Sequence, residues 1–247
     1  ARGSTGVGRA QTWTEILGRA RVVYEKGHFG DVQRIAGTSA GSITASLLAS
    51  GAGSKGLLDS VINTDFHDFI FDRGGFVGNV ARVTKHFGLH SGDSLCEMLR
   101  QRFEIYCGKR DVTFQELFDA SNEKGSRQKE LFVIASNLST QKGQVLSRGS
   151  FPDLPVWKAV RASLSIPFIF TPFEIDGDFY VDGGLSWNYP IDIFDADDPH
   201  DAVPGASDQP RDSSTLGFYL SSHDALAEGE TWGEDRVVID SLKTFSV

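Results

Sequence analysis

The chain has few residues of several kinds, and each shortage narrows what the protein can be. Its 247 residues include two cysteines and one methionine, and 24 Lys and Arg stand against 33 Asp and Glu, for a net charge of −9. The shortage of basic residues argues against nucleic acid as the main partner, because phosphate binding needs a concentrated basic face. No apolar run approaches the roughly 20 residues that span a bilayer, and no signal peptide opens the chain, so we expect a soluble, cytoplasmic protein.

Cys96 and Cys107 are predicted to be free thiols. They lie in or just past a segment with helical periodicity, and a helix between them would separate the sulfurs by roughly 16 Å, at about 1.5 Å per residue. That distance is far beyond disulfide reach, which makes a reducing compartment the default expectation. The histidines, at positions 28, 67, 86, 90, 200 and 223, are scattered and show no spacing of a metal site. We therefore expect neither a metal nor another cofactor.

The chain does contain enough apolar residues for one folded domain. Apolar side chains make up 40% of it and charged ones 23%, a balance that can bury one substantial core at this length. We expect a single domain over residues 1–247. Its segment 195–214 is predicted to be an exposed loop, because the composition there turns to Asp, Pro, Gly and Ser.

The most informative motif is Gly37-Thr38-Ser39-Ala40-Gly41. A β-leaning run precedes it, and the apolar segment 42–49, which reads as a buried helix, follows it. A serine in this setting lies on a sharp strand-to-helix turn, a nucleophile elbow, with the positive end of the helix at the reacting centre. We expect the glycines at 37 and 41 to remove Cβ atoms that would otherwise collide. The motif predicts that Ser39 is a catalytic nucleophile.

Strand and helix signals alternate along the rest of the chain. Thr113 and Glu116 form a capping box at a predicted helix start. The continuous apolar run 131–135 is typical of a strand buried on both faces, as in a parallel sheet. The remaining signals are a return strand at 144–147, a short helix at 157–163 and an Asp-Gly hairpin at 173–181 that ends at Asp182.

The turn Asp182-Gly183-Gly184 becomes informative through its neighbours. Together with the Ser39 elbow, Arg161-Ala162-Ser163, Pro167, Asn188 and Pro190, it occurs in the order seen in patatin-like phospholipases. From residue 1 to about residue 195 the chain resembles this family. The resemblance implies a three-layer α/β/α fold with a mostly parallel central sheet. It also implies a catalytic dyad of Ser39 and Asp182, with Gly37, Gly41, Gly183 and Gly184 as motif residues.

The resemblance further implies a lipid acyl hydrolase of the phospholipase A or lysophospholipase type. Ser39 would attack the ester and Asp182 would take its proton directly, giving an acyl-enzyme. The substrate would be a phospholipid or another acyl lipid at a membrane surface, where the protein would bind peripherally. A local basic patch could meet the lipid or form a solvated helix face: Arg73, Arg82, Lys85 and His86.

The family also has a Gly-rich oxyanion loop of the form G-G-G-x-R/K-G. The chain begins Ala1-Arg2-Gly3, which resembles the last three positions of that loop. We therefore expect Arg2 and Gly3 to belong to the oxyanion hole. The leading glycines of the loop and the strand before it do not occur in the sequence. A sheet without that strand would leave the edges of its neighbours unpaired, so we expect further residues before Ala1.

Other readings stay open at this point. An α/β-hydrolase triad of Ser39, Asp182 and either His200 or His223 has the right chain order, although only about 35 residues precede the elbow and His200 lies in a polar loop. A catalytically silent patatin-fold binding module is a second reading. Some injected bacterial effectors resemble the family and require a host protein for activation. Secretion into a host cell and a host activating protein are therefore hypotheses for this chain.

Overall fold

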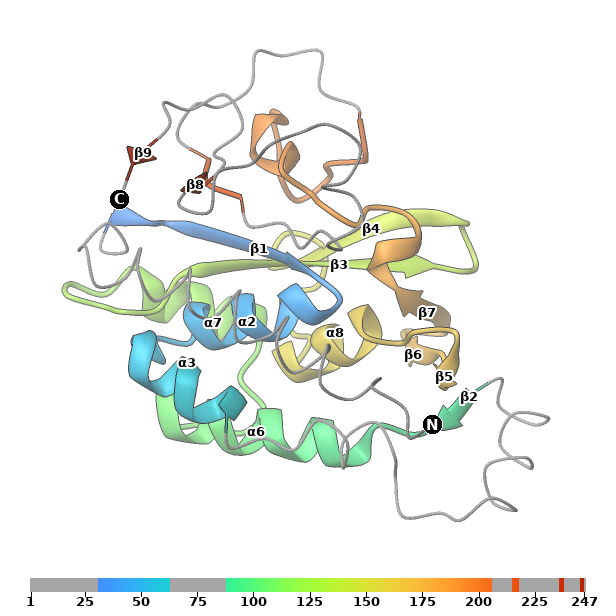
Figure 1. The fold of residues 1–247 in the computed structure, drawn as a ribbon, viewed down its shortest axis with the longest axis horizontal. Helices are drawn as coiled ribbons and strands as arrows, with labels where there is room; N and C mark the ends of the chain where they lie inside the picture. The colour runs from blue at the N-terminus through green and yellow to red at the C-terminus, as the bar shows by residue number, and fades with distance from the viewer. Residues whose placement is uncertain (1–30, 63–87, 206–214, 218–235, 238–244, 247) are drawn as a thin grey trace.

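The computed structural model describes residues 31–62, 88–205, 215–217, 236–237 and 245–246. It confirms the α/β fold: in these ranges, five helices lie on one face of a five-stranded sheet (Figure 1). The strands of this sheet are β1 (Arg34–Thr38), β3 (Glu130–Asn137), β4 (Lys142–Ser147), β6 (Phe173–Ile175) and β7 (Asp178–Asp182). The helices are α2 (Ala40–Ala49), α3 (Gly53–Ile62), α6 (Asp93–Cys107), α7 (Phe114–Ser121) and α8 (Val156–Ser163).

The smaller elements complete the described chain. The strands β2 (Gly88–His90) and β5 (Phe168–Phe170) form a parallel pair, and β8 (Arg236–Val237) and β9 (Phe245–Ser246) form an antiparallel pair. Two 3₁₀ turns, η2 (Gly183–Leu185) and η3 (Ile193–Asp195), follow β7. No helix within the described ranges combines the length and the hydrophobicity needed to cross a membrane.

The strand β3 lies at the centre of the sheet and has three partners. Along one edge, residues 132–137 pair with β4. Along the other edge, β1 pairs with residues 130–134 and β7 pairs with residues 135–137. The strands β1 and β7 therefore occupy successive stretches of the same edge, and β6 pairs with the far side of β7.

The sheet differs from the mostly parallel arrangement that we expected. Among the described strands of this sheet, the β1–β3 pairing is parallel, and the pairings of β3 with β4, β3 with β7 and β6 with β7 are antiparallel. For the β3–β4 and β6–β7 pairings the reason is connectivity, since short turns join these strands, and strands joined by a tight turn must run antiparallel. A long crossover through helices separates β1 from β3, which permits the parallel pairing.

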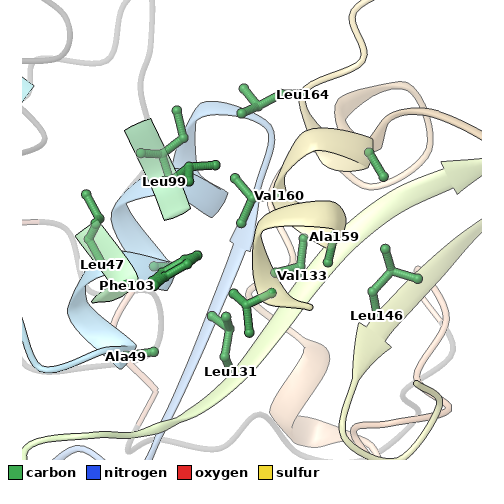
Figure 2. Packing of buried hydrophobic residues seen from close by; sticks show 14 of the residues in the cluster. Leu47, Ala49, Leu99, Phe103, Leu131, Val133, Leu146, Ala159, Val160 and Leu164 are labelled. Atoms are coloured by element: carbon green, nitrogen blue, oxygen red, sulfur yellow. The ribbon is translucent and has the colours of Figure 1, made fainter. Parts of the chain in front are cut away.

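The predicted double-sided burial of residues 131–135 is confirmed. The side chains of Leu131, Val133 and Ala135 pack against the helices, and Figure 2 shows Leu131 and Val133 beside Ala159 and Val160 of α8. The alternate residues face the other way, where Phe132 and Ile134 form a second cluster with Val145, Trp187, Ile193 and Ala202. The segment that follows β7 thus covers the face of the sheet opposite the helices.

Three local predictions can be compared with the structure. The capping box of Thr113 and Glu116 is confirmed, with both of its hydrogen bonds present. Cys96 and Cys107 are free, as predicted. The exposed loop predicted at 195–214 holds only in part, because Ala202 is buried and His200 stacks on the ring of Phe132; residues 206–214 lie outside the described part of the chain.

Candidate active site

Ser39 lies on a strained turn between β1 and α2. Its backbone has φ 50° and ψ −127°, and α2 begins at the next residue, Ala40. A positive φ is unusual for a residue with a side chain, and a conformation of this kind costs about 1–3 kcal/mol. The Ser42 N–H donates to the Ser39 carbonyl oxygen at 2.8 Å, so the helix starts directly from the turn. The strand–turn–helix setting predicted for Ser39 is present.

The two motif glycines of the elbow differ in what they do. A Cβ on Gly37 would lie 2.5 Å from the carbonyl oxygen of Gly41 and 2.7 Å from Cβ of Ala45, so only glycine fits there. A Cβ on Gly41 would meet no described atom within 4 Å. Within the described part of the chain, the expectation that Gly41 also prevents a collision is therefore not met, because a Cβ there would contact none of the described atoms.

The side chains of Ser39 and Asp182 are in direct contact. Ser39 Oγ donates a hydrogen bond to Asp182 Oδ2 at 2.5 Å, and the Gly184 N–H donates to Oδ1 at 2.7 Å. Asp182 is 7% exposed. Burial raises the pKa of its carboxyl above the ordinary value, although the hydrogen bonds from Ser39 and Gly184 act to lower it. A carboxylate with a raised pKa is a stronger base than a solvated one.

Sheet pairing brings these two residues together. Thr38, the last residue of β1, pairs with Ile134, and Asp182, the last residue of β7, pairs with Ala135. Because β1 and β7 share one edge of β3 and run toward each other, their carboxyl ends meet. The elbow then turns Ser39 out of the strand direction, toward Asp182.

The glycines after Asp182 fit closely against their neighbours. A Cβ on Gly183 would overlap the carbonyl oxygen of Ile134 in β3. A Cβ on Gly184 would lie 2.9 Å from Asp182 Oδ1 and 3.1 Å from Asn188 Oδ1. Both glycines therefore let the backbone approach closely, Gly183 at the sheet and Gly184 at the carboxylate.

Sequence reasoning missed several residues that hold the site. The Ser163 hydroxyl accepts a hydrogen bond from the Ser39 N–H at 2.8 Å and donates one to the Ile134 carbonyl oxygen at 2.6 Å. The Ser136 hydroxyl donates to the Asp182 carbonyl oxygen at 2.8 Å, and the Asp182 N–H donates to Ser165 O at 3.0 Å. Ser163 was visible in the sequence only as part of Arg161-Ala162-Ser163, with no signal for its role.

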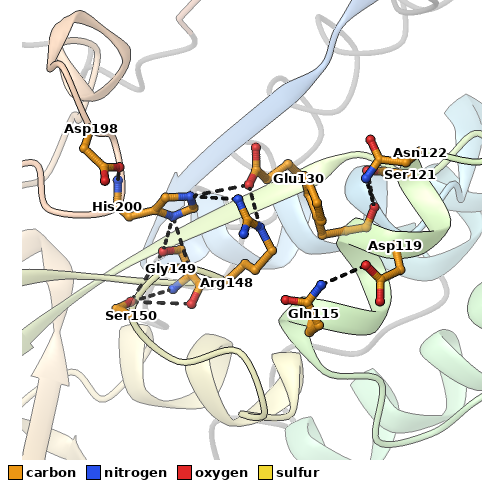
Figure 3. Close-up of polar contacts among 12 residues, drawn as sticks. Gln115, Asp119, Ser121, Asn122, Glu130, Arg148, Gly149, Ser150, Asp198 and His200 are labelled. Atoms are coloured by element: carbon orange, nitrogen blue, oxygen red, sulfur yellow. Dashed lines mark hydrogen bonds and ion pairs between the residues drawn. The ribbon is translucent and has the colours of Figure 1, made fainter.

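His200 lies at another place in the fold. Its Nδ1 is 2.8 Å from Ser147 Oγ and accepts from the Gly149 N–H, and its Nε2 is 3.6 Å from Glu130 Oε1 (Figure 3). The ring stacks on Phe132, which lies three residues before Ala135, the strand partner of Asp182, or roughly 10 Å away at about 3.3 Å per residue. The structure therefore does not bring His200 to Ser39.

Several predicted residues fall where the structure gives no description. Arg2 and Gly3 of the expected oxyanion loop, His223 of the alternative triad, and the basic patch of Arg73, Arg82, Lys85 and His86 all lie outside the described residues. Among the residues that are described, no group of three or more His, Cys, Asp and Glu side chains could hold a metal ion.

Known proteins with similar sequences include a protein family and two viral relatives. The family model described as Patatin-like phospholipase matches residues 2–195. The chain is 29% identical to an uncharacterized protein of Acanthamoeba polyphaga mimivirus over 187 residues, which cover 75% of this chain and 59% of the viral protein. It is 31% identical over 106 residues to the "Probable lipid hydrolase 463L" of Invertebrate iridescent virus 6, covering 43% of this chain and 34% of that protein.

A solved structure shows the same fold. VipD from Legionella pneumophila matches with a TM-score of 0.52 at 15% sequence identity, and the match covers 70% of this chain and 44% of VipD. The chain thus spans less than two thirds of the length of VipD and of the two viral relatives.

Proposed function

Because the chain belongs to the patatin-like phospholipase family, we propose that it is a lipid acyl hydrolase of the phospholipase A or lysophospholipase type, with Ser39 and Asp182 as its catalytic dyad. One observation carries this proposal: the 2.5 Å hydrogen bond from Ser39 Oγ to Asp182 Oδ2 at a strained elbow. A nucleophile in hydrogen-bond contact with a base is the arrangement that covalent catalysis requires. The sequence similarity to a viral protein named as a lipid hydrolase supports the same class of substrate.

In the first half-reaction, Ser39 Oγ attacks the carbonyl carbon of an acyl ester while its proton passes to Asp182 Oδ2. Burial raises the pKa of Asp182, which makes this proton transfer less unfavourable than it would be in water. The C–O bond to the leaving alcohol then breaks, and Asp182 returns the proton to the alcohol oxygen. The products of this step are the free alcohol, such as a lysophospholipid, and an acyl ester of Ser39.

In the second half-reaction, water takes the place of the alcohol. Asp182 accepts a proton from the water as its oxygen attacks the acyl ester of Ser39, and then returns that proton to Ser39 Oγ. A fatty acid leaves and the dyad is restored. One carboxylate therefore serves as base and acid in both steps, and the scheme needs no histidine.

Negative charge on the substrate oxygen needs hydrogen-bond donors. The Ser39 N–H already donates to Ser163, so it is not free for this task. The N–H of Ala40, the first residue of α2, precedes the helical hydrogen-bond pattern and carries the positive end of the helix dipole, so we assign it to the oxyanion. By resemblance to the family, Arg2 and Gly3 would contribute from the N-terminal loop.

Exposed apolar side chains near Asp182 support a lipid substrate and peripheral binding at a membrane. Leu185 is 65% exposed and lies three residues after Asp182, and Phe168 is 74% exposed and lies three residues after Ser165, whose carbonyl binds Asp182. Three residues span at most about 11 Å, so both side chains are anchored close to the dyad. Phe168 also has a φ of 68°, a strained conformation that holds a large apolar ring in contact with water.

The test is a lipid-release assay in which mass spectrometry identifies the fatty acids. We expect release from phospholipid by the wild-type chain, labelling of Ser39 by a fluorophosphonate probe, and loss of both in Ser39→Ala. A folded wild-type chain that neither labels nor releases fatty acid would instead indicate the silent binding module. The assay run with and without eukaryotic cell extract also tests the effector hypothesis, since equal activity in both would remove the need for a host activating protein.

A further inference from the structure

The residues at the end of α8 contact the backbone of both members of the proposed dyad. The Ser163 hydroxyl accepts the N–H of Ser39 at 2.8 Å, and the carbonyl oxygen of Ser165 accepts the N–H of Asp182 at 3.0 Å. Ser163 and Ser165 are two positions apart, whereas Ser39 and Asp182 are 143 positions apart. A single short segment thus spans the gap between the nucleophile and the base.

The Ser163 hydroxyl has both of its roles defined by buried partners. It is fully buried, and it donates to the carbonyl oxygen of Ile134 at 2.6 Å while it accepts from Ser39. Because the Ser163 hydroxyl donates to Ile134, its lone pairs point away from β3, and one of them can accept the Ser39 N–H. The Ser39 N–H is thereby held in the orientation that the strained φ of 50° requires.

Arg161 holds this segment against two other parts of the chain. Its side chain is almost completely buried at 1% exposure, and its Nη1 donates to Ser165 Oγ at 2.6 Å. Its Nε and Nη2 donate to the carbonyl oxygen of Ser91 at 3.0 and 2.8 Å, and Nη2 also donates to Thr171 O at 3.1 Å. A planar guanidinium with several fixed acceptors leaves little freedom to the backbone that it binds.

We propose that Ser163 is a positioning residue for the hydrolysis reaction: it holds the Ser39 backbone so that Oγ stays within hydrogen-bond distance of Asp182, and Arg161 fixes the segment 163–165 that carries this contact. The inference rests on the proposed function. It predicts that loss of the Ser163 hydroxyl slows the chemical step without weakening substrate binding, because misplacement of reacting groups by about 1 Å can cost roughly 100-fold in rate.

The test compares Ser163→Ala with Ser46→Ala. Ser46 is a matched control because it is also fully buried, lies on the elbow helix, and donates its hydroxyl to Ile43 O at 2.9 Å without contacting the dyad. For Ser163→Ala we expect kcat on a soluble ester to fall roughly 10- to 100-fold with KM changed less than about twofold. For Ser46→Ala we expect kcat within about twofold of the wild type. Equal kcat values in the two variants would overturn the proposal.

A second measurement does not depend on turnover. Hydrogen exchange at the Ser39 amide should become at least about tenfold faster in Ser163→Ala than in the wild type, because the amide loses its buried acceptor. It should stay unchanged in Ser46→Ala, and exchange that is equally slow in all three proteins would overturn the proposal. A wild-type chain with no esterase activity would defeat the proposed function, yet the exchange data would still decide the role of Ser163. If Ser163→Ala does not fold, Ser163→Cys, whose sulfur accepts weakly, takes its place; wild-type kcat and exchange in that variant would also overturn the proposal.

Discussion

Ser39 and Asp182 approach each other from opposite directions along one edge of β3. The strand β1 runs parallel to β3 and ends opposite Ile134, and β7 runs antiparallel to β3 and ends opposite Ala135. Neighbouring register positions on one central strand therefore place the two side chains in hydrogen-bond contact. This arrangement makes the separation of the proposed nucleophile and base a property of the sheet, whose central strand β3 is buried along nearly its whole length.

The pH dependence of hydrolysis should report the environment of Asp182. The proposed mechanism needs the ionised carboxylate, and burial raises the pKa of this carboxyl. As the pH falls through the raised pKa the base becomes protonated, so kcat/KM should decline at a higher pH than an ordinary aspartate would give. The profile is measured on a soluble ester, and an acid limb at or below the ordinary aspartate pKa would contradict the assignment.

Asp182→Asn should lose activity while gaining stability at neutral pH. Removal of a general base costs roughly 100- to 10,000-fold in rate. Since the folded pKa of Asp182 exceeds the unfolded one, ionisation of the buried group lowers the free energy of unfolding as the pH rises through that window. Asparagine does not ionise, so Asp182→Asn should be more stable to heat than the wild type. This difference should be full at a pH above the raised pKa and vanish at a pH below the pKa of the unfolded state. An advantage that grows toward acidic pH would refute this reading.

Gly37→Ala and Gly41→Ala should differ strongly in stability. The new Cβ at residue 37 would press on the carbonyl of Gly41 and on Ala45, and overpacking of this kind costs about 1–3 kcal/mol or more. The new Cβ at residue 41 would contact none of the described atoms and lies within α2, where alanine gains about 0.5–1 kcal/mol over glycine. Urea unfolding of both variants measures the difference, and equal losses would show that the elbow packs differently.

Phe168→Ser and Leu185→Ser should weaken binding to phospholipid vesicles. Insertion of one such side chain into lipid is worth about 1.5–3 kcal/mol, so each variant should bind roughly 10- to 150-fold more weakly than the wild type. The measurement is vesicle sedimentation in the Ser39→Ala background, which removes hydrolysis. Ile105→Ser is the matched control, because Ile105 is 64% exposed on α6 and outside the segments that contact the dyad. A loss of binding equal to that in Ile105→Ser would argue against contact of Phe168 and Leu185 with the membrane.

His200→Ala should lower stability and leave turnover intact. The ring stacks on Phe132 and contacts Ser147 and Gly149. Loss of these contacts should lower the free energy of unfolding by about 1–2 kcal/mol. Turnover should persist because the ring lies away from Ser39. The same assay is run on His223→Ala. If replacing one of these histidines abolished turnover, the enzyme would not use a Ser–Asp dyad.

Local signals in the sequence predicted much of the fold. The elbow helix, the capping box at Thr113 and the doubly buried strand at 131–135 each depend on residues close together in the chain, where periodicity and turn chemistry act. The direction of the sheet pairings was predicted less well, because it depends on which distant strands meet. The family resemblance, rather than any local pattern, named Asp182 as the partner of Ser39.

The sequence by itself determined the nucleophile motif, because Gly37, Ser39 and the helix after them form one continuous stretch whose backbone geometry is local. Only the tertiary structure decided what surrounds that motif. Contacts between distant segments produce the burial that raises the pKa of Asp182 and the acceptor that Ser163 offers to the Ser39 amide. Such contacts also place His200 against Phe132 and Ser147, away from Ser39. Such contacts depend on strand register and side-chain packing, which no single stretch of sequence specifies.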